Sequence, residues 1–122
     1  MGEYQKALEL FEKNVVWHTE RKSKKPLGIA KWCVARTLRS LGKTEEALKQ
    51  QFALIDWFKE TGLEEDGYIY EEIGECMLIL DKAEDAKPYF RKAYEVLPKD
   101  IWLAANEKDR LERLNKLGGT DV

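Results

Sequence analysis

The sequence is short of the residues that carry most protein chemistry. Its 122 residues include one histidine, two cysteines and three prolines, and no run near the ~18 apolar residues that a transmembrane helix needs. The N-terminal stretch MGEYQKALEL has neither the basic start nor the apolar core of a secretory signal. We therefore expect a cytoplasmic protein that does not bind a membrane.

The few cysteines and the single histidine also argue against a metal site. Cys33 and Cys76 lie in helical patterns beside apolar neighbours, and neither CxxC nor HxxxH spacing occurs with His18. Two buried thiols that behave as small apolar side chains are the expected arrangement. A disulfide is disfavoured in a chain without a secretory signal, and a metal site lacks its ligand set. We expect no metal and no cofactor.

Catalysis and nucleic-acid binding are disfavoured on similar grounds. The sequence has no Ser/His/Asp set and no glycine-rich phosphate loop, so it predicts no enzyme. A formal net charge of -2 does not favour a polyanion as partner. The basic stretch ERKSKK at residues 20–25 is short and holds no aromatic residue. We interpret it as a solvated loop rather than a nucleic-acid contact.

The sequence does contain a series of one-sided helical patterns. Apolar residues recur at intervals of three and four, as a helix with one buried face requires. Gly42 is suited to end one helix and Thr44 to cap the next, and Asp81 and Lys82 form a join with almost no loop. Helices joined so tightly run antiparallel and bury their apolar stripes together.

The helical patterns repeat at a nearly fixed distance. Ala7, Ala47 and Ala86 hold equivalent places, each about 40 residues after the one before, which is typical of a solenoid. The sequence therefore predicts an all-α fold, an antiparallel helix-hairpin solenoid of about five long helices plus a C-terminal capping helix, in a single domain over residues 1–122. The expected parts are the second helix of a truncated first repeat at 3–21, a second repeat at 27–61, a third repeat at 66–98 and the capping helix at 100–117.

Several finer features are expected within this plan. Gly74 and Ala86 should lie where the two helices of one hairpin approach closely, because a larger side chain there would overpack the interface. Pro88 should bend its helix, since it lacks an N–H group and its ring clashes with the preceding turn. In the last segment we expect Asn106 to cap a helix, and Trp102 and Leu103 to form a short turn against the last hairpin.

Residues 67–100 resemble a tetratricopeptide repeat. That family places an aromatic residue, Leu-Gly and a second aromatic residue on its first helix, and Ala, Phe, Ala and Pro on its second. Residues 28–61 match less fully, because Lys31, Gln51 and Leu54 replace the usual residues. The long period is similar to long-repeat variants such as kinesin-light-chain-type repeats, and residues 28–117 resemble the C-terminal part of small bacterial proteins of the family. The matching positions of the better repeat hold Tyr70, Ile73, Gly74, Met77, Ala86, Phe90, Ala93 and Pro98.

Stacked helix pairs of this kind present a concave surface lined by the first helix of each pair. We expect it to bind a protein or peptide whose basic part meets the glutamates and whose acidic part meets the arginines. The glutamates argue against a clamp for a C-terminal carboxylate, which they would repel. Packing within the fold is an alternative role for the same side chains. The expected surface consists of Ile29, Trp32, Arg36, Arg39, Tyr68, Glu71, Glu72 and Glu75.

Two function hypotheses follow from the architecture. The first is a protein- or peptide-binding scaffold or adaptor whose partner the sequence does not identify. The second is a structural or self-association module, because the helix at 3–21 lacks a preceding partner helix and would expose apolar residues. In that case the chain is the C-terminal piece of a longer solenoid or forms a homo-oligomer through this N-terminal edge. A bacterial regulatory sensor domain is a third reading that rests on the resemblance alone.

Overall fold

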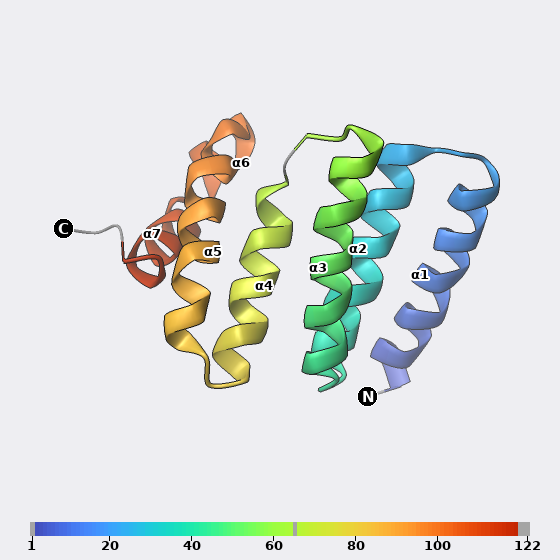
Figure 1. Ribbon diagram of the computed structural model, residues 1–122, viewed down its shortest axis with the longest axis horizontal. Coiled ribbons are helices and arrows are strands. Elements are labelled where there is room, and N and C mark those ends of the chain that lie inside the picture. The colour runs from blue at the N-terminus through green and yellow to red at the C-terminus, as the bar shows by residue number, and fades with distance from the viewer. Residues whose placement is uncertain (1, 65, 120–122) are drawn as a thin grey trace. The chain divides into compact units, whose positions relative to one another are not determined.

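The structure, a computed structural model, describes residues 2–64 and 66–119, and these residues contain seven α-helices, one short 3₁₀ turn and no strand (Figure 1). The expected all-α fold is confirmed. The chain divides into two compact units, residues 1–64 (unit 1) and residues 65–122 (unit 2). Each unit is described by itself below.

Unit 1 consists of three long helices, α1 (Gly2–Glu20), α2 (Lys24–Ser40) and α3 (Thr44–Thr61). They run alternately up and down, with α2 packed against both α1 and α3 (Figure 1). The apolar stripes face inward, and most charged residues lie on the outer faces. The buried apolar residues are Leu8, Leu27, Ala30, Val34, Ala35, Leu38, Ala47 and Leu54.

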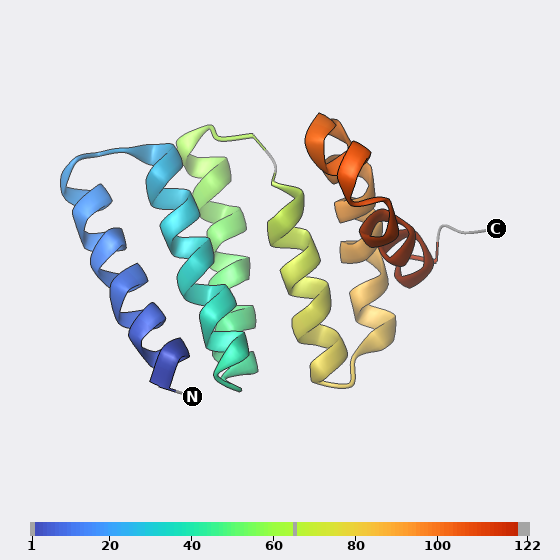
Figure 2. The same cartoon turned by 180° about the vertical axis from the view of Figure 1, so that it is seen from behind.

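Unit 2 is a helical hairpin with two short helices added at its C-terminal end. The hairpin is formed by α4 (Gly67–Ile79) and α5 (Ala83–Val96), followed by the 3₁₀ turn Leu97–Lys99, α6 (Ile101–Asn106) and α7 (Lys108–Leu117). The two hairpin helices run side by side, whereas α7 packs across α5 at a steep inclination (Figure 2). The segment expected as one capping helix at 100–117 is therefore two helices with a break at Glu107.

The close approach expected at Gly74 is confirmed. A Cβ atom on Gly74 would lie 2.6 Å from Cζ of Phe90, whose side chain is fully buried. Ala86, the small residue expected on the facing helix, is also fully buried. Pro88, where a bend was expected, does not end its helix, because α5 runs from Ala83 to Val96. The two helix backbones are thus brought together around one aromatic ring that fits only against a glycine.

Four helices end in the same way. After each of α1, α2, α3 and α4, one residue adopts the left-handed conformation, and the next N–H group donates to the carbonyl five residues earlier, which satisfies a free helix-end acceptor. The left-handed residues follow one another at nearly equal intervals, so one helix and its turn fill half of the period seen in the sequence. The left-handed residues are Lys22 (φ 55°), Gly42 (φ 82°), Gly62 (φ 75°) and Asp81 (φ 62°), and the bonds are Ser23 to His18, Lys43 to Leu38, Leu63 to Phe58 and Lys82 to Met77.

Three expectations about helix ends are wrong. Thr44 is the first residue of α3 rather than its cap, and Lys43 before it makes no side-chain capping bond. Asn106 does not cap α7, because it is the last residue of α6 and donates its Nδ2 back to the Trp102 carbonyl. Trp102 and Leu103 lie in a helix, and only Leu103 is buried, whereas Trp102 is 65% exposed.

Replacing Asp81 with glycine is expected to stabilise unit 2 by about 0.5–1 kcal/mol, because a side chain in the left-handed region costs roughly this much more than glycine. Asp81 occupies the place that Gly42 holds one repeat earlier. Urea unfolding followed by circular dichroism measures the change. The matched control is Gly42→Asp, which should lose a similar amount, and an Asp81→Gly variant no more stable than wild type would contradict the prediction.

Candidate functional site

The predicted concave-face residues of unit 1 lie along one side of α2. Ile29 is 64% exposed, and Trp32, Arg36 and Arg39 are half-buried. Nη1 of Arg36 donates to Oγ of Ser40, one turn further along the same helix, at 2.6 Å. The spacing of three and four residues places these four side chains on one face of α2.

Unit 1 also contains a groove that the sequence did not predict. It has a volume of about 440 Å³, within the range of small-ligand and side-chain pockets. Its walls come from all three helices and are mainly apolar, and we call it the α1–α3 groove. None of the four predicted residues of α2 lines it. The lining residues are Glu12, Val15 and Val16 of α1, Lys31 and Val34 of α2, and Gln50, Ala53, Leu54 and Trp57 of α3.

Lys31 is the cation of the α1–α3 groove. Its Nζ lies 4.2 Å from the centroid of the Trp57 ring, whose electron-rich face attracts a cation. Burial lowers the pKa of Lys31 from its ordinary value. Among the residues that the structure describes, Lys31 forms no ion pair. A carboxylate that entered the groove beside Lys31 would therefore favour the charged form of the lysine.

The predicted residues of unit 2 lie along α4, and two of them are more buried than a solvated binding surface would be. Glu71 is 7% exposed and Glu72 is 5% exposed, while Tyr68 and Glu75 are half-buried. Residues 68, 71 and 75 follow helical spacing, so they form one stripe, which we call the α4 acidic stripe. Burial, and next the charge of Asp100, raise the pKa of Tyr68.

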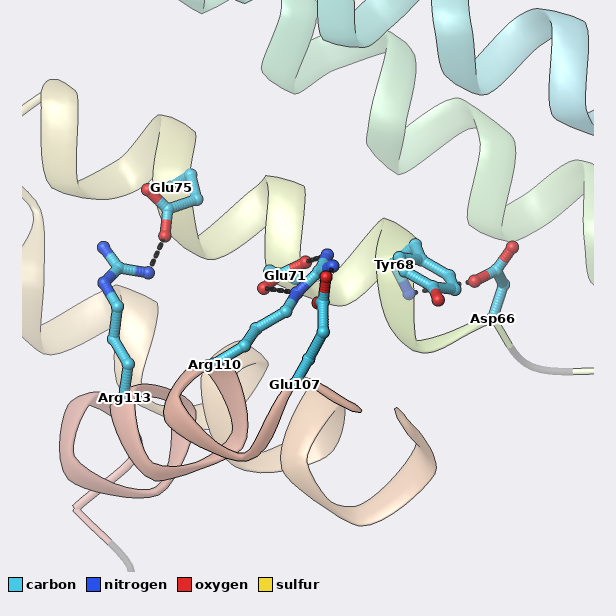
Figure 3. Close-up of polar contacts among 7 residues, drawn as sticks. All are labelled: Asp66, Tyr68, Glu71, Glu75, Glu107, Arg110 and Arg113. Carbon is cyan, nitrogen blue, oxygen red and sulfur yellow. Dashed lines mark hydrogen bonds and ion pairs between the residues drawn. The ribbon is translucent and has the colours of Figure 1, made fainter. Parts of the chain in front are cut away.

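Two arginines of α7 bind the α4 acidic stripe (Figure 3). The guanidinium of Arg110 holds both carboxylate oxygens of Glu71, with Nε donating to Oε2 at 2.9 Å and Nη2 donating to Oε1. Its Nη1 also donates to Oε2 of Glu107 at 2.8 Å, and the hydrogen bond to Glu71 raises the pKa of Arg110. Arg113 donates from Nη1 to Oε1 of Glu75.

The basic groups that the sequence predicted for a partner of this stripe are thus supplied by α7 of the same chain. The Arg110 guanidinium also lies 5.1 Å from the centroid of the Tyr68 ring, so both the aromatic residue and the carboxylates of the stripe face α7. Sequence reasoning missed Arg110 and Arg113, which are 39 and 38 residues from their partners. The sequence does contain one signal for this pairing. Arg110 and Arg113 are three residues apart, about one helical turn, so both can face α4.

Groups suited to metal binding or thiol chemistry are few among the described residues. They contain no group of three or more His, Cys, Asp or Glu side chains that could hold a metal ion. Cys33 and Cys76 are both free thiols. Cys76 is fully buried as expected, and Cys33 is half-buried, which raises the pKa of its thiol. None of the helices in residues 2–64 and 66–119 has the length and hydrophobicity of a membrane-spanning segment.

Comparison with protein-family models found no match, and neither curated proteins nor solved structures gave a significant one.

Proposed function

We propose that the chain is a cytoplasmic, non-catalytic scaffold built from helix pairs of the tetratricopeptide type, and that it binds a protein or peptide. The observation that carries the binding role is the α1–α3 groove, which is apolar and has at its wall a lysine that forms no ion pair within the described residues.

The repeat character of the scaffold is supported by equivalent contacts in the two hairpins. A Cβ on Gly28 of α2 would lie 3.1 Å from Cε1 of Phe58, and a Cβ on Gly67 of α4 would lie 2.7 Å from Cγ of Leu97. Gly67 follows Gly28, and Leu97 follows Phe58, by the same number of positions. The same offset relates Gly42 to Asp81 at the turns. Equivalent residues thus make equivalent contacts, as expected of a repeated unit.

The groove suits an amphipathic peptide segment that carries a carboxylate beside its apolar side chains. The apolar walls give affinity by burying such side chains, and Lys31 favours an acidic residue next to them. Val16, which is 58% exposed, extends the apolar surface toward the outer face of α1. Ile29, Trp32, Arg36 and Arg39 offer a further contact on α2 for the same class of partner.

Replacing Ala53 with glutamate is expected to weaken peptide binding about tenfold or more, because the new side chain fills the groove and repels the partner carboxylate. The probe is a peptide selected against the wild-type chain from a random library displayed on phage, then labelled and titrated by fluorescence anisotropy. The selected peptides should contain Asp or Glu next to apolar residues, and Lys31→Met should remove that preference.

Ala105→Glu is the matched control, because Ala105 is also an exposed helical alanine but lies in unit 2. It should bind the peptide as the wild type does. If no peptide is enriched, or if Ala53→Glu and Ala105→Glu bind alike, the groove is not the binding site.

Self-association is a second candidate function, favoured by the exposed apolar side chains of α1. Sedimentation velocity over a hundredfold range of concentration tests it, and a single monomeric species throughout contradicts it. Four large apolar side chains of this helix are more than half exposed, and exposed apolar side chains favour burial against another copy. They are Tyr4 at 51%, Leu10 at 57%, Val16 at 58% and Trp17 at 52%.

A further inference from the structure

Helix α7 is a short helix that packs on α5. It has 10 residues, which is too short for a stable helix on its own in water. Its one fully buried side chain is Leu114. At its end, Gly118 packs against the backbone of Arg91, and Nη2 of Arg91 donates to the Gly118 carbonyl at 3.1 Å. The position of α7 therefore depends on Leu114 and on polar contacts together.

Two arginines of α7 make polar contacts to the α4 acidic stripe. Arg110 makes the two-pronged bond to Glu71, and Arg113 pairs with Glu75 one turn further along α4 (Figure 3). The carboxylates of Glu71 and Glu75 are four residues apart on one helix face, and the arginines are three residues apart on the other. The planar two-pronged geometry favours arginine over lysine.

The backbone at Glu107 can act as a hinge for the release of α7. Glu107 separates α6 from α7 with a backbone that is not helical (φ -125°, ψ 49°), and α6 is fixed by the fully buried Leu103. A change of backbone angles at this residue would swing α7 away while the hairpin and α6 stay in place. Glu107 also accepts a hydrogen bond from Arg110, so the residue at the break between the helices contacts the arginine that binds Glu71.

From these observations we propose that α7 is an autoinhibitory latch. Arg110 and Arg113 occupy, within the chain, a surface on α4 that accepts a partner helix with two arginines at the same spacing. The partner displaces α7 by offering equivalent guanidinium groups to Glu71 and Glu75. The residues of this surface belong to unit 2 and those of the α1–α3 groove belong to unit 1, so variants of one leave the residues of the other unchanged.

The test uses full-length chains and a labelled peptide with the sequence of residues 106–119 as the probe. In the wild type the peptide competes with α7 and binds weakly. In the double variant Arg110→Gln/Arg113→Gln the latch is weakened, and binding measured by fluorescence anisotropy should tighten about tenfold or more. Adding Glu71→Gln and Glu75→Gln to that variant should abolish the gain, because the carboxylates that receive the peptide arginines are then neutral.

The matched control is Lys108→Gln/Lys116→Gln, which removes the same charge from exposed positions of α7 and should leave peptide binding as in the wild type. Hydrogen exchange gives a second readout. In Arg110→Gln/Arg113→Gln the amides of α7 should exchange faster while those of α4 and α5 remain protected. Unchanged peptide binding, unchanged exchange in α7, or loss of protection throughout unit 2 would each overturn the latch, the last because α7 would then be an inseparable part of the fold.

Discussion

Replacing Gly74 with valine will destabilise unit 2 by about 3 kcal/mol or more, because the added atoms overpack a filled interface. A single Cβ on Gly74 would already lie 2.6, 2.7 and 2.8 Å from three atoms of the Phe90 ring. The ring is fully buried and has no solvent-exposed side toward which it can move. Valine adds two further methyl groups at the same place. The helices α4 and α5 must then separate, which exposes apolar surface along the whole hairpin.

The measurement is urea unfolding followed by circular dichroism, with the free energy of unfolding compared at equal slope. Gly2→Val is the matched control, since a Cβ on Gly2 meets no atom within 4 Å and the variant should keep nearly full stability. Phe90→Leu in the Gly74→Val background should recover part of the loss by making room. If Gly74→Val is as stable as Gly2→Val, the close approach of α4 and α5 is not a constraint on the fold.

Helix boundaries were predictable where the sequence carries the residue that the backbone needs. Gly42 was expected at a helix end, and it adopts the left-handed conformation there. Lys22 has the same conformation without the glycine signal, so only the regular spacing of the turns could have revealed it. The caps of α4 and α6 were missed although Asp66 and Asp100 are favoured capping residues, and both accept a backbone N–H bond.

The candidate site was predictable in its local part only. Helical spacing alone placed Glu71 and Glu75 on one face of α4, because that property depends on neighbours within two turns. Their burial and their pairing with Arg110 and Arg113 depend on where α7 packs, which is set by contacts between residues 38 and 39 positions apart. The α1–α3 groove forms only when all three helices have packed together, so no local sequence pattern predicts it. Its cation, Lys31, stood out in the sequence only as a departure from the repeat pattern.

Replacing Gln51 with an apolar residue should increase stability. Gln51 lies on the buried stripe of α3 between Ala47 and Leu54 and is fully buried. Neither Oε1 nor Nε2 of its amide has a hydrogen-bond partner among the residues that the structure describes. Gln51→Leu removes this buried polar group at similar volume and should raise the free energy of unfolding by about 1–3 kcal/mol.

The control for Gln51→Leu is Gln5→Leu, the same substitution at an exposed position of α1, which should change stability by less than about 0.5 kcal/mol. Urea midpoints at an unchanged slope compare the two variants. A Gln51→Leu chain no more stable than wild type would show that the amide is satisfied in solution. One repeat after Gln51 stands Phe90, which fills the equivalent place in the other hairpin with an apolar ring. A gain in stability would therefore mean that the α2–α3 hairpin carries, at one position, a cost that the α4–α5 hairpin avoids.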